Sequence, residues 1–365
     1  MKSAHNPELS IIVPVLNEAA ELPALFDTLA SQQAVCFELI LCDGGSVDGT
    51  QRLASELASN VLFRVKIIQV ARGRGQQMNE GAAIAKGELL LFLHADSRFH
   101  DPTALYSAIT AYREQIAISV SQPVAARFEL CFRRTDTFPS LAYFFYEAKA
   151  RLDRSDCIRG DQGYLLSRTF FAQLCGFDTS LPFYEDVVLA EQITQQGNWL
   201  LLPARISTSA RRFELEGLAR RQVVNAIIVN SFAVGWKDFI ALLPDFYQCH
   251  ADSGRLRLLP LLEGVRTRLA HQNRRWLLTF WQNTGRHVAS NIWQLFFWLD
   301  VRRSFRADRD QGAVEPRWLR FYQQHLEWLA HTHLAGTITA AAVWIWFRIM
   351  LLVFRLRETA PTKTS

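Results

Sequence analysis

Short apolar runs of strand length alternate with segments of helical periodicity in the first part of the chain. Residues 8–15, 37–42, 66–70 and 89–93 have the length and composition of buried strands, and the segments between them repeat apolar residues at helical spacing. Strands and helices that alternate through short connections form right-handed crossovers and a parallel sheet. The pattern therefore predicts an α/β sandwich.

The alternation continues less regularly after residue 120. Apolar runs and their polar boundaries predict three more strands and further helices, and one of these helices begins with the adjacent acids Glu185 and Asp186. The expected strands are 123–132, 164–166 and 199–203, and the expected helices include 19–31, 141–152 and 187–196.

Polar residues follow the predicted strands where each one ends. His94 and Asp96 come directly after strand 89–93, and Asp43 follows strand 37–42. Ligands of open parallel sheets gather outside the carboxyl ends of the strands, and an aspartate there suits a hard divalent cation. The common alternative is that Asp96 and Ser97 only cap the next helix or turn.

Two glycine-rich segments lie at other strand ends. Residues 43–50, DGGSVDGT, contain three glycines, which let the backbone approach a ligand, although Asp43 could equally serve a turn. Arg72 and Arg74 lie on a glycine-containing loop that opens a helix. They fit a diphosphate or a solvated pair of charges. Neither segment is a Walker or dinucleotide-binding fingerprint.

Charged pairs further along the chain also have two interpretations. Glu185 and Asp186 could supply a general base at the mouth of the sheet, or could only complement the dipole of the helix that they begin. Arg211 and Arg212 suit a phosphate but are equally typical of a solvated surface.

Charge and tryptophan divide the chain of 365 residues unequally. Residues 251–365 carry 17 Lys and Arg against 8 Asp and Glu, a net charge of +9, whereas residues 1–250 carry 23 against 27, a net charge of −4. Eight of the ten tryptophans also lie after residue 250. Arginine with interfacial tryptophan suits an anionic bilayer surface, and no nucleic-acid-binding motif is present, so we expect no nucleic-acid partner.

The cysteines show no CxxC spacing, and no secretory signal precedes them. We therefore expect reduced, buried thiols in a cytosolic protein. They are Cys36, Cys42, Cys131, Cys157, Cys175 and Cys249.

Apolar stripes at helical spacing predict a helical C-terminal region with a packed core. Residues 337–354 are long enough for a marginal membrane span, but Arg348 interrupts them at a cost of about 2.5–3.5 kcal/mol. The basic residues after this segment would also put the C-terminus in the cytoplasm. A single span would then place the N-terminal α/β domain on the other side of the membrane, which argues against a span. We expect a helix at the membrane interface, peripheral to the inner face, with a soluble helical bundle as the alternative. The stripes are Leu262, Val265, Leu269, Trp276 and Phe280, and Trp318, Phe321, His325, Trp328 and Leu329.

Several motifs together resemble the inverting family 2 glycosyltransferases of GT-A fold. They are SIIVPVLNE, LCDGGSVDGT, LLLFLHADS and YEDVVLAEQI, in that order, and the resemblance covers about residues 9–247. RGRGQQMNEGA, the HAD triplet, GDQG and STSARRFELEG further resemble the subgroup called radical SAM/selenodomain-associated transferase 2, which is linked by name to arsenosugar biosynthesis.

The resemblance implies a nucleotide-diphospho-sugar transferase fold, with a mostly parallel central sheet flanked by helices and a helical region after it. It implies a nucleotide-sugar donor, an acceptor hydroxyl on a small or lipid-linked molecule, and a divalent metal, Mn or Mg. The metal would bind Asp96, with His94 in the place of the usual first aspartate. Asp186 would be the catalytic base with Glu185 beside it, and the substrate-binding candidates are Pro14, Asn17, Glu18, Asp43, Gly44, Arg74, Asp161, Gln162, Arg211 and Arg212.

The expected organisation is a GT-A domain at 1–215, a helical extension at 216–250 and a basic, Trp-rich helical region at 251–365. Two other functions remain open. A nucleotidyltransferase shares the glycine-rich α/β architecture, although the Glu185–Asp186 pair and the DGGSVDGT segment argue against it. A catalytically silent nucleotide-sugar-binding protein is the other, because His94 departs from the family pattern.

Overall fold

The computed structural model describes residues 6–119, 122–181, 183–236, 238–240, 256–310 and 314–358. The chain divides into two compact units, Met1–Ala210 and Arg211–Ser365. The division falls just before helix α8 (Arg211–Glu216), in which the expected domain boundary at residue 215 lies.

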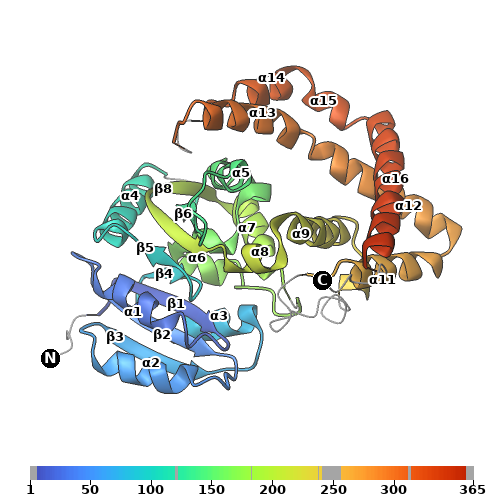
Figure 1. Ribbon diagram of the computed structural model, residues 1–365. Helices are drawn as coiled ribbons and strands as arrows, with labels where there is room; N and C mark the ends of the chain where they lie inside the picture. Colours follow the sequence, from blue (N-terminus) through green and yellow to red (C-terminus); the bar gives the residue numbers. More distant parts are fainter. Residues whose placement is uncertain are drawn as a thin grey trace. The chain divides into compact units, whose positions relative to one another are not determined.

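The first unit combines strands with helices on both faces of one sheet (Figure 1). Its elements are β1 (Leu9–Val15), α1 (Leu22–Ala30), β2 (Phe37–Asp43), α2 (Thr50–Ser59), β3 (Arg64–Gln69), α3 (Arg74–Ala83), β4 (Leu89–Phe92), β5 (Arg98–Phe99), α4 (Ala104–Ile118), β6 (Val124–Arg133), α5 (Leu141–Lys149), the 3-10 turns η1 (Ser155–Cys157) and η2 (Gly160–Gln162), β7 (Tyr164–Ser167), α6 (Arg168–Gln173), α7 (Glu185–Gln196) and β8 (Asn198–Ser209).

The order of strands in the sheet is β3-β2-β1-β4-β7-β6-β8-β5. The first four strands pair in parallel, as predicted, whereas β7 is antiparallel to both β4 and β6. The chain moves outward from β1 to β3 and then returns to β4 on the other side of β1. The carboxyl ends of β1 and β4 thus flank a topological switch point, which is where ligands bind in open α/β sheets.

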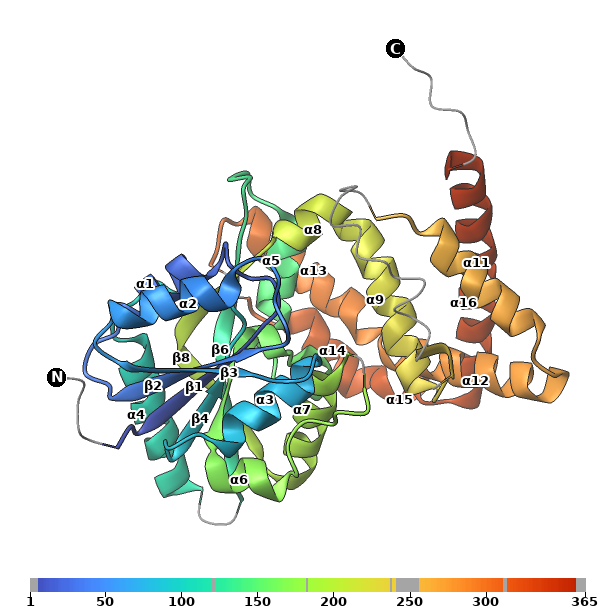
Figure 2. The same cartoon turned by 90° about the horizontal axis from the view of Figure 1, so that it is seen from below.

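Alternate residues of each central strand pack against different helices. Ile11 and Val13 of β1 belong to a core shared with α1, α2 and α4, whereas Ile12 faces a second core shared with α3, α6 and α7. Figure 2 shows α1 and α2 on one side of the sheet and α3 on the other. The apolar runs lack polar alternation because both faces are buried, and the predicted α/β architecture with a helical region after it is confirmed.

The structure differs from the expected boundaries in two places that matter for the site. The strand expected at 199–203 is β8 (Asn198–Ser209), which continues past Pro203 because it pairs with both β6 and the short strand β5. The first helix begins at Leu22 rather than at residue 19, since Pro23 occupies its first turn.

The described part of the second unit is helical. Its elements are α8, α9 (Leu218–Ala233), α11 (Leu259–Ala270), α12 (Arg274–Ser290), α13 (Trp293–Arg306), α14 (Arg317–His325), α15 (Glu327–Ala330) and α16 (His333–Glu358). The 26-residue α16 runs along α12 and contains the predicted segment 337–354.

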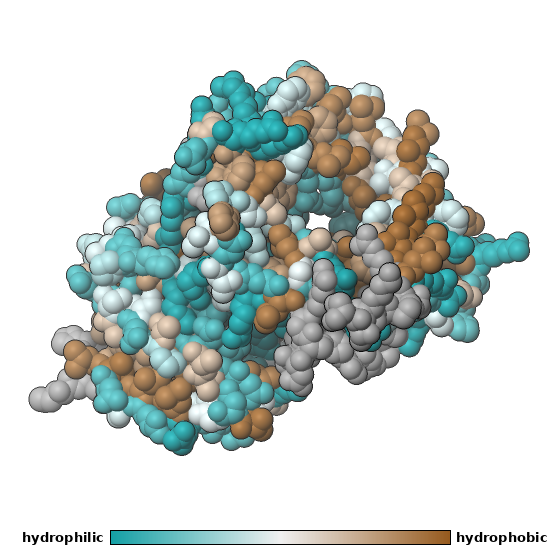
Figure 3. All heavy atoms as spheres, viewed as in Figure 1, coloured by the Kyte–Doolittle hydropathy of each residue, from teal (hydrophilic) through white to brown (hydrophobic). Residues whose placement is uncertain are grey.

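The two predicted apolar stripes have different outcomes. Leu262, Val265, Leu269 and Phe280 are buried as expected. The second stripe is not a core, because Trp318, Phe321, Trp328 and Leu329 are all exposed, and Leu319 and Tyr322 are buried in their place. Hydrophobic side chains gather over α13–α16 in Figure 3.

The described cysteines are free thiols, which agrees with the reduced state that we expected. Cys42 and Cys157 are buried, and Cys36 and Cys131 are partly so. The expectation of burial is wrong for Cys175, which is exposed in the left-handed turn that follows α6. Cys249 lies outside the described residues.

Candidate functional site

The loop after β2 is held in place by the carboxylate of Asp43. This side chain is fully buried and accepts hydrogen bonds from the backbone of Gly45 and Ser46, the Ser46 hydroxyl and the Gln51 amide. Burial acts to raise the pKa of Asp43, but these hydrogen bonds outweigh it and hold the pKa below its ordinary value. The ionised carboxylate of Asp43 therefore holds the glycine-rich loop in place.

The loop after β1 is fastened to the loop after β2. Asn17 has a left-handed backbone with φ 56°; its N–H donates to Ser46 Oγ at 2.8 Å, and its Oδ1 accepts from Val47 N at 2.9 Å. The N–H of Glu18 donates to Thr50 Oγ1 at 3.0 Å. Asn17 and Glu18 thus lie beside the Asp43 loop at the carboxyl end of the sheet.

Gln77 of α3 joins the ends of β1 and β2, a role that the sequence did not reveal. Its buried amide donates to the carbonyls of Val15 at 2.9 Å and Cys42 at 2.6 Å. Gly44 packs directly on this side chain, since a Cβ there would lie 3.1 Å from it. Pro14, one residue before Val15, pairs in register with Cys42. The two strand ends therefore form a single ordered rim.

Arg74, in the first turn of α3, is bound to the two acids that begin α7. Its Nε donates to Glu185 Oε1, and its Nη2 lies 3.5 Å from Asp186 Oδ1. The Glu185 side chain is 2% exposed, whereas that of Asp186 is 13% exposed. Glu185 therefore anchors Arg74 from the protein interior, and Asp186 is the more solvent-accessible member of the pair.

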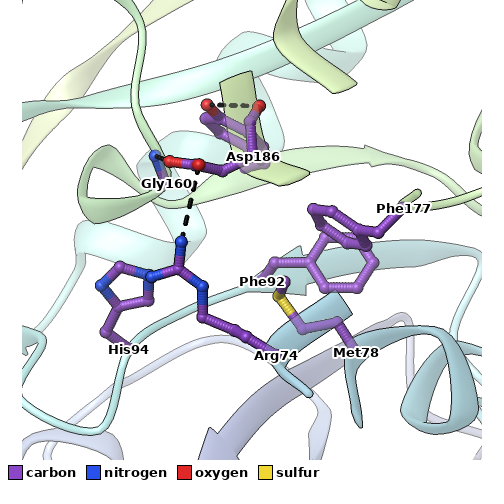
Figure 4. A pocket seen from close by; sticks show the side chains of 8 residues that line it. Arg74, Met78, Phe92, His94, Gly160, Phe177 and Asp186 are labelled. Carbon is purple, nitrogen blue, oxygen red and sulfur yellow. Dashed lines mark hydrogen bonds and ion pairs between the residues drawn. The ribbon is translucent and has the colours of Figure 1, made fainter. Parts of the chain in front are cut away.

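The carboxylate of Asp186 is held in its ionised form. Its Oδ2 accepts from the backbone N–H of Gly160 at 2.8 Å (Figure 4). A Cβ on residue 160 would lie 3.1 Å from that oxygen, so a glycine permits this close approach. Burial acts to raise the pKa of Asp186, but Arg74, the Gly160 N–H and Arg159 outweigh it and lower the pKa. A carboxylate that stays ionised can accept a proton.

His94 lies on the opposite side of Arg74, at the carboxyl end of β4. Figure 4 shows the Arg74 guanidinium beside the imidazole and directed at Asp186. Burial, and then the charge of Arg74, lowers the pKa of His94 to about 4, so the ring is neutral at pH 7. The space between these groups is a cavity of about 10 Å³, enough for about one water molecule. It is lined by Arg74, Met78, Phe92, His94, Gly160, Tyr164, Phe177 and Asp186.

Asp96 is tied to the end of β8 rather than to the turn that follows it. Its Oδ2 accepts from Thr208 Oγ1 and from the Ser209 N–H, both at 2.9 Å, and Arg133 donates to its carbonyl at 2.7 Å. Ser97 alone serves the turn, through its hydroxyl and the His94 N–H. The helix-capping alternative for the Asp96 carboxylate is therefore wrong.

The residues at the end of β4 fit a divalent cation only as a partial set of ligands. Within the described ranges, no group of three or more His, Cys, Asp and Glu side chains is arranged to hold a metal ion. Asp96 keeps Oδ1 without a hydrogen-bond donor among the described residues, and His94 is neutral, the form that binds metals. This set suits a cation that takes its other ligands from substrate phosphates.

Two polar side chains of η2 are buried near Asp186 without full hydrogen bonding. Asp161 Oδ1 and Gln162 Oε1 receive no hydrogen bond from the described residues, although the Gln162 amide donates to Cys157 O at 2.8 Å. Burial, and then the charge of Asp186, raises the pKa of Asp161 to about 7. Asp161 is thus a carboxyl group that is partly protonated at neutral pH.

Replacing Asp161 with Asn is expected to stabilise the protein at pH 8 by on the order of 1 kcal/mol, and by less at pH 5. The pKa in the folded state is raised above the ordinary value, so wild-type stability is lost as pH rises through about 7, whereas Asn stays neutral throughout. Thermal melts at the two pH values measure the difference. Equal shifts at pH 5 and pH 8 would contradict the raised pKa.

The fold collects most of the predicted residues at one edge of the sheet. Arg74, His94 and Asp186 line one cavity, and Asp96, Asp161 and Gln162 come from elements that border it. Arg211 and Arg212 do not line that cavity; they begin α8 in the second unit. The sequence did not identify Gln77, Arg133 or Thr208 as residues of the site. Gln77 and Thr208 lie inside motifs that carry the family resemblance, whereas no sequence signal marked Arg133.

Known proteins similar to this chain are glycosyltransferases. Residues 10–173 match the family described as Glycosyl transferase family 2. PGL/p-HBAD biosynthesis glycosyltransferases of Mycobacterium bovis and Mycobacterium tuberculosis are each 42% identical over 118 residues, 32% of this chain. The matched region spans 44% of the length of these relatives. An uncharacterized glycosyltransferase of Haemophilus influenzae is 37% identical over 91 residues, 25% of this chain and 30% of its own length.

Two solved structures are similar at low identity. S. aureus TarS 1-349 in complex with UDP matches with a TM-score of 0.49 and 17% identity, over 87% of this chain and 91% of that chain. The mannosyltransferase PcManGT from Pyrobaculum calidifontis in complex with GDP-Man and Mn²⁺ matches with a TM-score of 0.45 and 14% identity, over 94% and 88%. The family match covers β1 to α6, which include the rim, but it ends before Phe177 and Asp186 of the cavity. The match to Glycosyl transferase family 2 spans residues 10–173, which is less than half of this chain.

Proposed function

We propose that this protein is an inverting glycosyltransferase, which moves a sugar from a nucleotide-sugar donor to an acceptor hydroxyl. The observation that carries the proposal is that Asp186, an ionised carboxylate, lies across one cavity from the carboxyl end of β4 at the switch point of the sheet. That arrangement separates a proton acceptor from the crevice where a nucleotide binds in such folds.

Asp186 is the proposed catalytic base. Inversion requires one carboxylate that removes the acceptor proton while the hydroxyl oxygen attacks the anomeric carbon from the face opposite the leaving group. The Gly160 N–H fixes the orientation of Asp186, and Arg74 keeps it ionised. Glu185 is too buried for this task, and its contact with Arg74 supports a positioning role.

The rim formed by Asn17, Glu18 and the Asp43 loop is the proposed nucleotide side of the site. Pro14 and Gly44 belong to the same rim, and Asp161, Gln162, Arg211 and Arg212 remain further candidates for substrate contact. Asp96 and His94 would hold a divalent cation, Mn or Mg, which when bound would neutralise charge on the departing diphosphate. Arg74 supplies positive charge from the protein itself.

Arg74 is expected to change partners when the donor binds. The cavity between His94 and Asp186 has room for only about one water molecule, so a sugar ring cannot enter while the guanidinium fills that space. Glu185 retains the Nε of Arg74, and Nη1 donates no hydrogen bond to a described residue. The guanidinium can therefore turn its Nη groups from Asp186 toward a diphosphate.

The subgroup assignment to radical SAM/selenodomain-associated transferase 2 is also a proposal. Its support is that the motifs which carry the resemblance come together in space. Arg74 and Gln77, the GDQG segment and Thr208 all border the carboxyl ends of the central strands. The acceptor is accordingly a small molecule or a lipid-linked molecule with a free hydroxyl.

A thermal-shift screen of nucleotide-sugars, with and without Mn²⁺, tests donor binding. At least one donor is expected to raise the melting temperature, because a ligand that binds only the folded state stabilises it by mass action. A matched screen with nucleoside monophosphates is the control for binding of the base alone. The proposal fails if no nucleotide-sugar shifts the transition under either condition.

We further propose that the helical unit attaches the enzyme to the inner face of an anionic membrane without crossing it. Helix α16 is long and apolar enough to span, with a mean hydropathy of 1.9 in its most apolar window of 18 residues. One face of it is buried through Phe347 and Leu351, whereas Ile345, Ile349 and Leu352 on another face are exposed. A helix with one side held by protein and an apolar side free suits an interface.

High salt or carbonate is expected to release the full-length protein from anionic vesicles. Surface attraction contributes about 1 kcal/mol per basic residue and is screened by salt. Ile345→Asp should reduce co-sedimentation at least about tenfold, since a charge then faces the acyl region. Ile118→Asp is the matched control, because Ile118 is an exposed apolar residue of the first unit. Retention after carbonate treatment would favour a span.

A further inference from the structure

A second cavity, of about 200 Å³, lies wholly within the unit Arg211–Ser365. It is bordered by the end of α9, the start of α12 and the turn before α12. Aromatic side chains form its walls, and a carboxylate and two amides reach into it. The residues that carry the argument are Trp236, Trp276 and Phe280 for the walls and Asp238, Gln272 and Asn283 for the polar groups.

Local chain geometry explains why these residues meet. Helix α9 ends in a left-handed turn at Gly235, where the N–H of Trp236 returns to the Ser231 carbonyl at 2.8 Å. This 6→1 hydrogen bond is the Schellman end of a helix, and it sends the Trp236 side chain back toward α12. Trp276, Phe280 and Asn283 are spaced by four and then three residues on α12, so one helix face presents all three.

The aromatic walls pack closely on one another. Trp236 stacks on Phe239 with ring centroids 4.4 Å apart, and Trp276 stacks on Phe280 at 5.1 Å. The two stacked pairs meet edge to face, since Trp236 lies 5.6 Å from Trp276 at 61° and 5.1 Å from Phe280 at 74°. A preformed aromatic surface loses little side-chain entropy when a ligand binds.

The polar groups have unused hydrogen-bonding capacity. The side chains of Asp238, Gln272 and Asn283 make no hydrogen bond to any residue in the described part of the chain. Together they offer four carboxylate or amide oxygen acceptors and two amide NH₂ donors. Such groups around an apolar floor give a ligand orientation and specificity.

The lining selects among ligand classes. Among the residues that the structure describes, none that borders the cavity is a lysine or an arginine, so the described lining gives no support for a phosphate or a nucleotide. An acyl chain would leave the carboxylate and both amides without partners. An organic ammonium ion would form cation–π contacts with the aromatic rings and an ion pair with Asp238, but it would leave the amide donors of Gln272 and Asn283 unpaired.

A sugar ring satisfies both kinds of surface. Its C–H face can pack on the indole and phenyl rings, while its hydroxyls both donate to and accept from the amides and the carboxylate. The volume also limits the size of the ligand. The cavity of about 200 Å³ is smaller than the roughly 300–1,000 Å³ of pockets that hold drug-sized ligands. One ring is therefore a better match than an oligosaccharide or a nucleotide-sugar.

We propose that this cavity is a saccharide-binding site, which holds one neutral sugar ring against Trp276; the amides of Gln272 and Asn283 exchange hydrogen bonds with its hydroxyls, and the Asp238 carboxylate accepts from them. The site does not rest on the proposed transfer activity, because every described residue that lines it belongs to the helical unit.

Saturation-transfer NMR with the full-length protein tests the site. The probes are the methyl glycosides of glucose, galactose, mannose and N-acetylglucosamine, with choline as the representative ammonium ion. At least one glycoside is expected to bind with millimolar affinity. Asn283→Ala should weaken it about three- to tenfold, as for the loss of one or two hydrogen bonds, and Trp276→Ala should weaken it at least tenfold.

Gln282→Ala is the matched control, since Gln282 is exposed on the same helix next to Asn283. It should leave the affinity within about twofold, and melts should show that all variants remain folded. The proposal is overturned if no glycoside binds, if binding survives both Asn283→Ala and Gln272→Ala unchanged, or if choline binds in preference and depends on Asp238.

Discussion

Asp186→Asn is expected to keep donor binding while the rate of sugar transfer falls by about 10²–10⁴-fold. Asparagine has nearly the shape of aspartate, and its Oδ1 can still accept from the Gly160 N–H, so the cavity should persist. It cannot take a proton from the acceptor hydroxyl. Donor affinity by calorimetry and turnover under saturating donor separate the two effects.

Glu185→Gln and Glu191→Gln provide the comparison. Glu185→Gln loosens the anchor of Arg74 and should weaken donor binding more than it lowers the saturated rate. Glu191 is exposed on the same helix as Asp186, so its replacement should change neither parameter by more than about twofold. Turnover that survives in Asp186→Asn but is lost in Glu185→Gln would transfer the role of base to Glu185.

Asp96→Ala is expected to weaken Mn²⁺-dependent donor binding about tenfold or more. Asp96 is the carboxylate with a free oxygen at the end of β4, and removal even of groups that only orient a metal ligand typically costs 10–100-fold. The measurement is the Mn²⁺-dependent part of the thermal shift caused by the best donor. Metal-independent stabilisation by the nucleotide itself should remain.

Two further variants show whether the effect comes from the carboxylate or from disturbance of β8. Thr208→Val removes one hydrogen bond to Asp96 but leaves the carboxylate, so most of the metal dependence should survive. Asp27→Ala replaces an exposed aspartate of α1 and should have no effect. The same Mn²⁺ dependence in Asp96→Ala as in the parent protein would show that the metal assignment is wrong.

The sheet could be predicted because its central strands are buried on both faces. β1, β2 and β4 are continuous apolar runs with polar residues directly at their carboxyl ends, so the sequence reveals both the strand and its functional end. The start of α7 was equally clear, because two acids precede an apolar helical stripe. The end of β4 and the start of α7 brought His94 and Asp186 to the same cavity.

Features that depend on long-range pairing could not be predicted. β8 continues beyond Pro203 because β5 and β6 are its partners, and the two-residue β5 has no periodicity of its own. The link between Asp96 and Thr208 spans 112 residues, and no local pattern announces it. The stripe Trp318–Leu329 has helical spacing, but spacing alone does not distinguish a core from an exposed apolar face.

The most direct measurement of the central claim is the product that the purified protein releases from nucleotide-sugars. Incubation of a donor panel with Mn²⁺ and candidate acceptors, followed by separation of the products, should yield a nucleoside diphosphate, and Asp186→Asn should lower that yield by at least about 10²-fold. No nucleoside diphosphate from any donor would contradict the claim, and so would release of inorganic pyrophosphate in a parallel incubation with nucleoside triphosphates and sugar phosphates. The latter result would identify a nucleotidyltransferase instead.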